Sequence, residues 1–181
     1  MRPTQLKMFS FTNGVSHINI ENCFTGQLPR RVIIGFLATD RYNGNYKLNP
    51  YKFEHFDLNY LVLGVNGVQI PARALEPDFT NDKFALTYQH FLKSICVWDF
   101  DRSCGISREE YGKGYTLFSV AISPDGCQPG EHFSFITNGS LRLECKFATP
   151  LAQPTHLFVM GEFDNMLEID INKSVAYDTQ S

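Results

Sequence analysis

Phe56-Asp57-Leu58-Asn59-Tyr60-Leu61-Val62-Leu63-Gly64-Val65-Asn66-Gly67-Val68-Gln69-Ile70 is the stretch that decides the fold class of this chain. Phe56, Leu58 and Tyr60 alternate with polar residues and an apolar run follows, which predicts a β-strand from Phe56 onward. Asn66-Gly67 suits a two-residue hairpin turn, because both turn positions need a positive φ. Pro71 then ends the second strand or marks a sheet edge, because proline has no N–H for the ladder.

The same alternation recurs along the chain. Leu141, Leu143, Cys145 and Phe147 alternate with charged residues, which predicts a half-buried strand with one wet face. Further strands are predicted at 15–20, 31–37, 115–122, 132–136, 157–163 and 166–171. Asn138-Gly139 is predicted to form a tight turn.

One connection has helical spacing instead. Apolar residues fall at i, i+4, i+7, i+8 and i+11, namely Phe84, Tyr88, Phe91, Leu92 and Ile95. This spacing predicts a helix-bearing connection at about 81–95, which Thr80 or Asn81 would cap. A short helical turn is predicted at about 107–112, where Ser107 and Glu110 form a capping box and Gly112 ends the turn.

Together these patterns predict an all-β fold, an eight-stranded antiparallel jelly-roll sandwich that forms one domain over residues 1–181. An immunoglobulin-like sandwich is the alternative. That fold places a tryptophan against a pair of core cysteines, whereas Trp98, the only tryptophan, falls in the predicted connection.

Composition narrows the functional classes. The 181 residues are 43% hydrophobic and 19% charged with a net charge of −3 and no basic block, which argues against a nucleic-acid groove. The N-terminus lacks the apolar segment of a secretion signal, and no apolar run approaches the ~20 residues of a membrane span. The five cysteines are odd in number and none are two residues apart, so we expect reduced thiols in an intracellular protein.

Catalytic patterns are weak throughout the sequence. The histidines are scattered, with none four residues from another: His17, His55, His90, His132 and His156. We therefore expect no metal site, no cofactor and no enzymatic activity. An enzyme of the cupin type would need a histidine-rich strand motif, which the sequence lacks. Cys104 and His90 could be interpreted as a catalytic thiol and its base. We favour the alternative interpretation, in which Cys104 is a loop cysteine beside an amphipathic helix.

Several short segments carry a family resemblance through their order along the chain. They are Phe24-Thr25-Gly26-Gln27-Leu28-Pro29-Arg30-Arg31, Asn43-Gly44-Asn45-Tyr46, Asn49-Pro50-Tyr51-Lys52-Phe53, Leu75-Glu76-Pro77-Asp78-Phe79, Ile106-Ser107-Arg108-Glu109-Glu110-Tyr111, Gly114-Tyr115-Thr116-Leu117-Phe118 and Glu162-Phe163-Asp164-Asn165-Met166-Leu167-Glu168-Ile169-Asp170. In this order the chain resembles the C-terminal half of the hexon-like double jelly-roll major capsid proteins of Polinton (Maverick) elements and adintoviruses.

The resemblance implies a structural virion protein without catalytic residues. Such proteins carry two jelly rolls per chain and form trimers, which are pseudo-hexagonal capsomers of an icosahedral shell. The implied partners are other copies of the chain, an N-terminal jelly-roll barrel and neighbouring capsomers. Nucleic acid and membranes are not expected partners.

The loop around Gly44 is a candidate subunit contact. Its candidate residues are Tyr42, Asn43, Tyr46, Tyr51 and Phe53. Exposed tyrosines beside asparagines also suit a lectin-like module that binds a sugar through its end loops, which is the alternative function.

The resemblance covers one barrel where the family has two. A truncated or mis-split gene model, a fragment of a degraded integrated element and a domesticated single-barrel protein are all consistent with this difference. A barrel that normally packs against a sister barrel has an apolar flank, so the isolated chain is expected to self-associate or precipitate.

Overall fold

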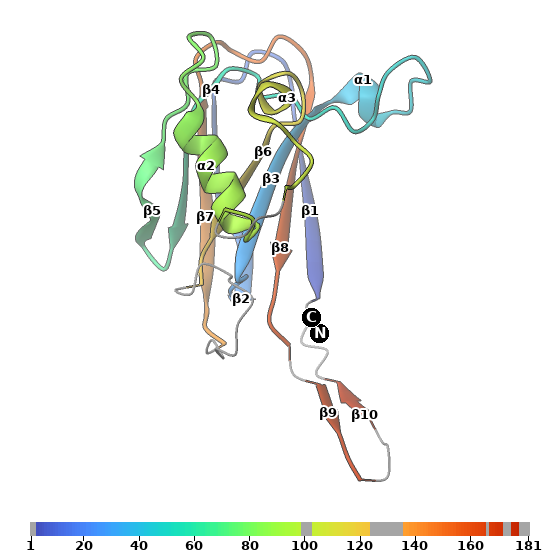
Figure 1. Ribbon diagram of the computed structural model, residues 1–181, viewed down its shortest axis with the longest axis vertical. Helices are drawn as coiled ribbons and strands as arrows, with labels where there is room; N and C mark the ends of the chain where they lie inside the picture. Colours follow the sequence, from blue (N-terminus) through green and yellow to red (C-terminus); the bar gives the residue numbers. More distant parts are fainter. Residues whose placement is uncertain (1–2, 99–102, 124–135, 166, 172–174, 178–181) are drawn as a thin grey trace.

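A computed structural model describes residues 3–98, 103–123, 136–165, 167–171 and 175–177. Two four-stranded antiparallel sheets pack face to face (Figure 1). The first sheet has the order β1-β8-β3-β6, with β1 at Thr4–Phe11, β8 at Thr155–Glu162, β3 at Arg31–Ala38 and β6 at Leu117–Ala121. The second sheet has the order β2-β7-β4-β5, with β2 at His17–Gln27, β7 at Asn138–Phe147, β4 at Leu58–Val65 and β5 at Val68–Leu75.

Every connection between consecutive strands of the sandwich crosses from one sheet to the other, except the β4–β5 hairpin. This interleaving is the jelly-roll arrangement, so the predicted fold class is confirmed. The core lies between the sheets and uses the inward residues of both. Val32, Ile34 and Phe36 of β3 face Leu141, Leu143 and Cys145 of β7 across it, and all six are buried.

The helical segments lie on the outer side of the first sheet. The helix α2 (Ala85–Ser94) packs on β6, and the short helix α3 (Arg108–Gly112) lies beside it. Phe84, Phe91 and Tyr111 form a second, smaller core there. The Ser107–Glu110 capping box is present, as predicted, whereas α2 begins later than predicted and has no side-chain cap. Asn81 instead donates to the carboxylate of Asp78 within a separate turn.

The Asn66-Gly67 turn is confirmed, because both residues have positive φ, and Pro71 lies on the edge strand β5. The predicted start of the preceding strand at Phe56 is wrong. Phe56 and Asp57 both have positive φ and form a turn, which the Leu58 N–H closes onto the His55 carbonyl, so the strand begins at Leu58.

The predicted turn at Asn138-Gly139 is also wrong. Both residues belong to β7, where they pair with Gln27 and Gly26 of β2. A Cβ on Gly139 would lie 2.0 Å from Oδ1 of Asn66, and this oxygen accepts a hydrogen bond from the Ser140 N–H. Gly139 therefore makes room for a contact with the β4–β5 turn rather than reversing the chain.

The eighth strand of the sandwich is β1, which the sequence patterns did not predict. The predicted strand at 166–171 instead contributes β9 (Leu167–Ile169), which pairs only with β10 (Val175–Tyr177), within the described part of the chain. Most of the strand predicted at 132–136 lies outside the described residues. Figure 1 shows the β9–β10 hairpin standing clear of the sandwich, beyond the end of β8.

Candidate interaction surface

The outer surface of the first sheet carries an apolar area between polar residues at its two ends. Strand register places Leu6, Met160 and Ile33 in one row across β1, β8 and β3, and Met8 and Phe158 in the next row. Leu6 is 63% exposed and Met8 is 43% exposed, and the other three are partly exposed. We call these five residues the apolar face.

The outer surface of the second sheet is polar. Its rows hold His17 beside Lys146 and Asn19 beside Glu144, with Arg142 on the same strand. The Glu144 carboxylate lies 3.1–3.3 Å from His17, Arg142 and Lys146. Burial acts to raise the pKa of this carboxyl, but the hydrogen bond and the charge of Lys146, together with the charge of Arg142, hold the pKa below its usual range. A shallow depression of about 490 Å³ lies over this sheet. This surface has the polar outer face that an antiparallel sheet presents to water.

All four sheet edges carry features that oppose pairing with another strand. On β1, Lys7 occupies an inward position opposite Val159, and its ammonium lies 5.1 Å from the centre of the Phe24 ring. The edge strand β2 has an irregularity between Ile20 and Phe24, β5 carries Pro71, and α2 packs on β6. Inward charges, bulges, prolines and covering helices protect edges from pairing. The apolar face differs from these edges, because it is an exposed apolar part of the same sheet.

The predicted contact loop lies beside the apolar face. It follows the short helix α1 (Thr39–Tyr42) and projects from the sandwich (Figure 1). Tyr46 is 91% exposed and Tyr51 is 73% exposed, and Asn43 is also exposed. These three residues are thus available to a partner, and their contact role stays a prediction.

Tyr42 and Phe53, unlike the other three candidate residues, contact the first sheet. The Tyr42 ring lies 4.5 Å from the ring of His156 and 6.0 Å from that of Phe158. Phe53 is partly buried against Gly35, where an added Cβ would lie 2.9 Å from the phenylalanine ring. Both residues anchor the loop to the first sheet, so the loop and the apolar face form one continuous surface.

Two of the segments that carry the family resemblance bind each other at the end of β8. Arg30 pairs with Asp164 at 3.3 Å, and Gln27 donates to the Asp164 carbonyl at 2.6 Å. The rings of Phe24 and Phe163 meet edge to face at 5.5 Å. We call these five residues the β8 clasp. The segments look like surface motifs in the sequence, but they serve an internal contact.

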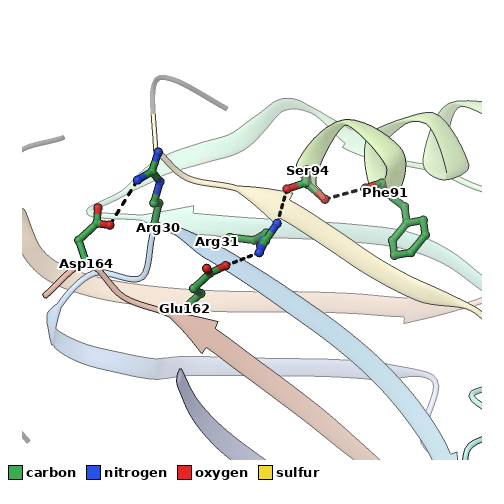
Figure 2. A network of polar contacts seen from close by, with 6 residues as sticks. All are labelled: Arg30, Arg31, Phe91, Ser94, Glu162 and Asp164. Carbon is green, nitrogen blue, oxygen red and sulfur yellow. Dashed lines mark hydrogen bonds and ion pairs between the residues drawn. The ribbon is translucent and has the colours of Figure 1, made fainter. Parts of the chain in front are cut away.

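A second ion pair joins this region to α2. Figure 2 shows Arg31 between the Glu162 carboxylate and the backbone carbonyl of Ser94, to which it donates at 2.7 Å. The side chains of Arg31 and Glu162 are 18% and 14% exposed. The pair ties the C-terminal end of α2 to the edge of the apolar face.

The buried thiols have no nucleophilic character. Cys23 and Cys145 are both free and fully buried in the core. Burial raises the pKa of Cys23 to about 11 and raises that of Cys145 as well, so both remain protonated near neutral pH. Cys104 donates to the Ile106 carbonyl rather than to a histidine.

Within the described ranges, no three His, Cys, Asp or Glu side chains gather to hold a metal ion. In the same part of the chain, no helix is long and apolar enough to cross a membrane.

No family model matches the chain. It is 29% identical over 188 residues to an uncharacterized protein of Caenorhabditis elegans, F54H12.2, and the match covers 99% of this chain and 43% of that protein. The chain thus spans less than half the length of this relative. Among solved structures it is similar to a chain of the Sputnik virophage determined by cryo-electron microscopy, with a TM-score of 0.55, 13% identity and coverage of 98% of this chain and 38% of that one. The jelly-roll fold is therefore shared with a virophage protein.

Proposed function

We propose that this chain is a structural virion protein, one jelly roll of a major capsid protein that forms trimeric, pseudo-hexagonal capsomers of an icosahedral shell. Residues 1–181 act as a single jelly-roll unit, equivalent to the second barrel of the Polinton and adintovirus capsid proteins. The observation that carries the proposal is the contrast between the two sheets. One outer surface is polar, and the other presents the apolar face.

The apolar face contributes part of a protein interface. Three strands at ~4.8 Å spacing and about three residues each at ~3.3 Å rise give a surface of roughly 140 Å². A standard interface covers ~800 Å² of each partner. The adjoining loop with Tyr46 and Tyr51 extends the surface toward this value, and tyrosine is enriched at interfaces.

The partners are other jelly-roll barrels. Because the sheet edges are protected, a neighbour binds face on rather than by extending the sheet. Copies of this chain and a further barrel fit that requirement. The C. elegans relative extends well beyond the segment that matches, and that further length is room for a second barrel.

A sugar-binding role is the second candidate, and the exposure of Tyr46 and Tyr51 favours it. Aromatic side chains and neighbouring amides are able to stack on and hydrogen-bond a sugar ring. A glycan array with no bound sugar removes this candidate, whereas loss of binding in a Tyr46→Ala, Tyr51→Ala variant supports it.

Sedimentation velocity of the intact chain tests the capsid proposal. The proposal predicts species larger than the 20.6 kDa monomer, with a trimer at threefold mass, at micromolar concentrations. A monodisperse monomer at high concentration contradicts it.

A further inference from the structure

The loop after α1 (residues 43–57) joins β4 through a backbone turn that few residue types adopt. Phe56 has a φ of 47° and Asp57 a φ of 52°, and neither is glycine. This left-handed conformation is uncommon in such residues, above all in a bulky one, and it persists only where the surroundings hold it. The turn at residues 55–58 therefore depends on the hydrogen bonds and contacts made around it.

His55 supplies several of these contacts. Its Nδ1 accepts a hydrogen bond from the Asp57 N–H at 2.9 Å, and its carbonyl accepts one from the Leu58 N–H at 2.9 Å. Its ring stacks on that of Phe79, with the centroids 4.1 Å apart and the planes inclined by 9°. Phe79 in turn stacks on Phe84 of the smaller core beside α2. One histidine thus holds the turn and fixes the end of the loop to the segment before α2.

The hydrogen bond to Asp57 determines the protonation state of the ring. An amide N–H can only donate, so Nδ1 carries no proton and the ring is neutral, with its proton on Nε2. The Asp57 carboxylate oxygen Oδ1 lies 3.3 Å from the same Nδ1. Protonation of Nδ1 would therefore exchange one partner for another. The ring would donate to the Asp57 carboxylate and would no longer accept from the Asp57 N–H.

The surroundings favour the neutral ring. Burial lowers the pKa of His55 from its usual value of 6.5, and the charges of Asp57 and Glu54 oppose this effect only in part. Glu54 is itself bound by Arg41 at 3.3 Å and by Lys52 at 2.9 Å. His55 lines an open cleft of about 240 Å³, so protons from solvent reach the ring. The charged side chains that line this cleft are Lys52, Glu54, Asp57 and, from the segment after α3, Lys113.

We propose that protonation of His55 is a switch that releases the loop after α1 in mild acid. The neutral ring accepts from the Asp57 N–H and holds the turn in its closed state. The protonated ring donates to the Asp57 carboxylate instead, so Phe56 and Asp57 return to negative φ and the loop loses its contact with Phe79. Because Tyr46 and Tyr51 lie on this loop, acid also weakens the association of copies, and this consequence alone rests on the proposed capsid function.

The direction of the pH dependence follows from the two states of the loop. In the open state His55 is exposed and its pKa takes the usual value of 6.5, whereas the closed state holds that pKa lower. The open state therefore binds the proton more tightly. The closed state is fully favoured above pH ~6.5 and loses this advantage as the pH falls below that value.

Hydrogen exchange of the intact chain tests the switch. After correction for the intrinsic pH dependence of exchange, amides of residues 43–57 should exchange about fivefold faster at pH ~5 than at pH ~7.5, whereas those of β7 should not change. A histidine NMR titration of the same chain gives the midpoint, and the loop should open over the range in which the His55 ring titrates. Loop exchange that does not respond to pH, or that responds with a different midpoint, overturns the switch.

Two substitutions remove the titration in opposite ways. His55→Asn keeps an acceptor, because an asparagine Oδ1 can accept from the N–H two residues on, so its loop should stay closed at both pH values. His55→Phe keeps a stacking ring without an acceptor, so its loop should exchange rapidly at both. His17→Asn, at the exposed pair with Glu144, is the matched control and should keep the response of the parent chain. A His55→Asn chain whose loop still opens in acid overturns the inference.

Sedimentation velocity at the same two pH values separates the switch from the capsid proposal. A chain whose loop opens in acid but which stays monomeric supports the switch and contradicts the capsid proposal. A chain that associates but whose loop does not respond to pH contradicts the switch and leaves the capsid proposal standing.

Discussion

Placing charge on the apolar face should separate association from folding. The double variant Leu6→Glu, Met8→Glu changes two residues that are 63% and 43% exposed and that point away from the core. Full burial of such a side chain contributes ~1.5–3 kcal/mol, so the part still exposed in the monomer is worth about 1 kcal/mol for each residue on docking. Loss of both contributions corresponds to a dissociation constant raised by about thirtyfold.

Sedimentation velocity across a concentration series measures this dissociation constant, and urea unfolding measures the stability of the monomer. Because neither side chain belongs to the core, the free energy of unfolding should change by less than ~1 kcal/mol. Val68→Glu, on the second sheet, is the control and should associate like the parent chain. If the double variant associates as tightly as the parent chain, the apolar face is not the interface.

Four further perturbations test individual parts of the structure. Arg31→Ala removes one partner of the largely buried Glu162 carboxylate and should lower the free energy of unfolding by ~2–4 kcal/mol in urea titrations. The control Arg142→Ala removes an exposed partner of Glu144 and should lower it by less than ~1 kcal/mol. Equal losses in the two variants would show that the Arg31 pair has no special role. Gly35→Ala should lower the free energy of unfolding by ~1–3 kcal/mol and speed proteolysis of the loop after α1, because the added Cβ meets the Phe53 ring at 2.9 Å. An unchanged rate of proteolysis would argue against Phe53 as the anchor of the loop. Ser107→Ala should cost ~1 kcal/mol through the lost cap of α3, measured by thermal unfolding, and a neutral result would dispute the capping box. Folding raises the pKa of the Cys23 thiol from about 9 to about 11, so the contribution of this thiol to stability should be complete below pH ~9 and decline as pH rises toward 11. Over this pH range Cys23→Ala should lose less stability than the parent chain. Parallel pH profiles of the two proteins would contradict the buried-thiol assignment.

The strands that face the core on one side only were predictable from sequence. In β7, buried Leu141, Leu143 and Cys145 alternate with polar residues, and this strand has a wet outer surface. In β1 the alternation is hidden, because Leu6 and Met8 are apolar on the outer side and Lys7 is charged on the inner side. The features that protect the edge and create the apolar face are the ones that obscure the strand. A strand that has apolar residues on both sides and one inward charge can therefore be used to predict an edge strand with an exposed apolar surface.

The candidate site was predictable only in part, because its two halves come from distant segments. The loop residues Tyr46 and Tyr51 stand out as tyrosines among asparagines and are exposed. The apolar face instead depends on the pairing of β1 with β8, which joins residues about 150 positions apart. Sequence patterns give the periodicity of each strand but not its neighbour in the sheet. For the same reason, the contact of Arg30 with Asp164 could not be read from either segment alone.

Cryo-electron microscopy of the oligomer formed by the intact chain tests the central claim most directly. The account predicts a threefold particle in which Leu6, Met8 and Met160 of each copy are buried against a neighbouring copy, and in which the charged surface around Glu144 faces solvent. A particle that buries the surface around Glu144 and leaves Leu6 and Met8 in solvent would contradict it.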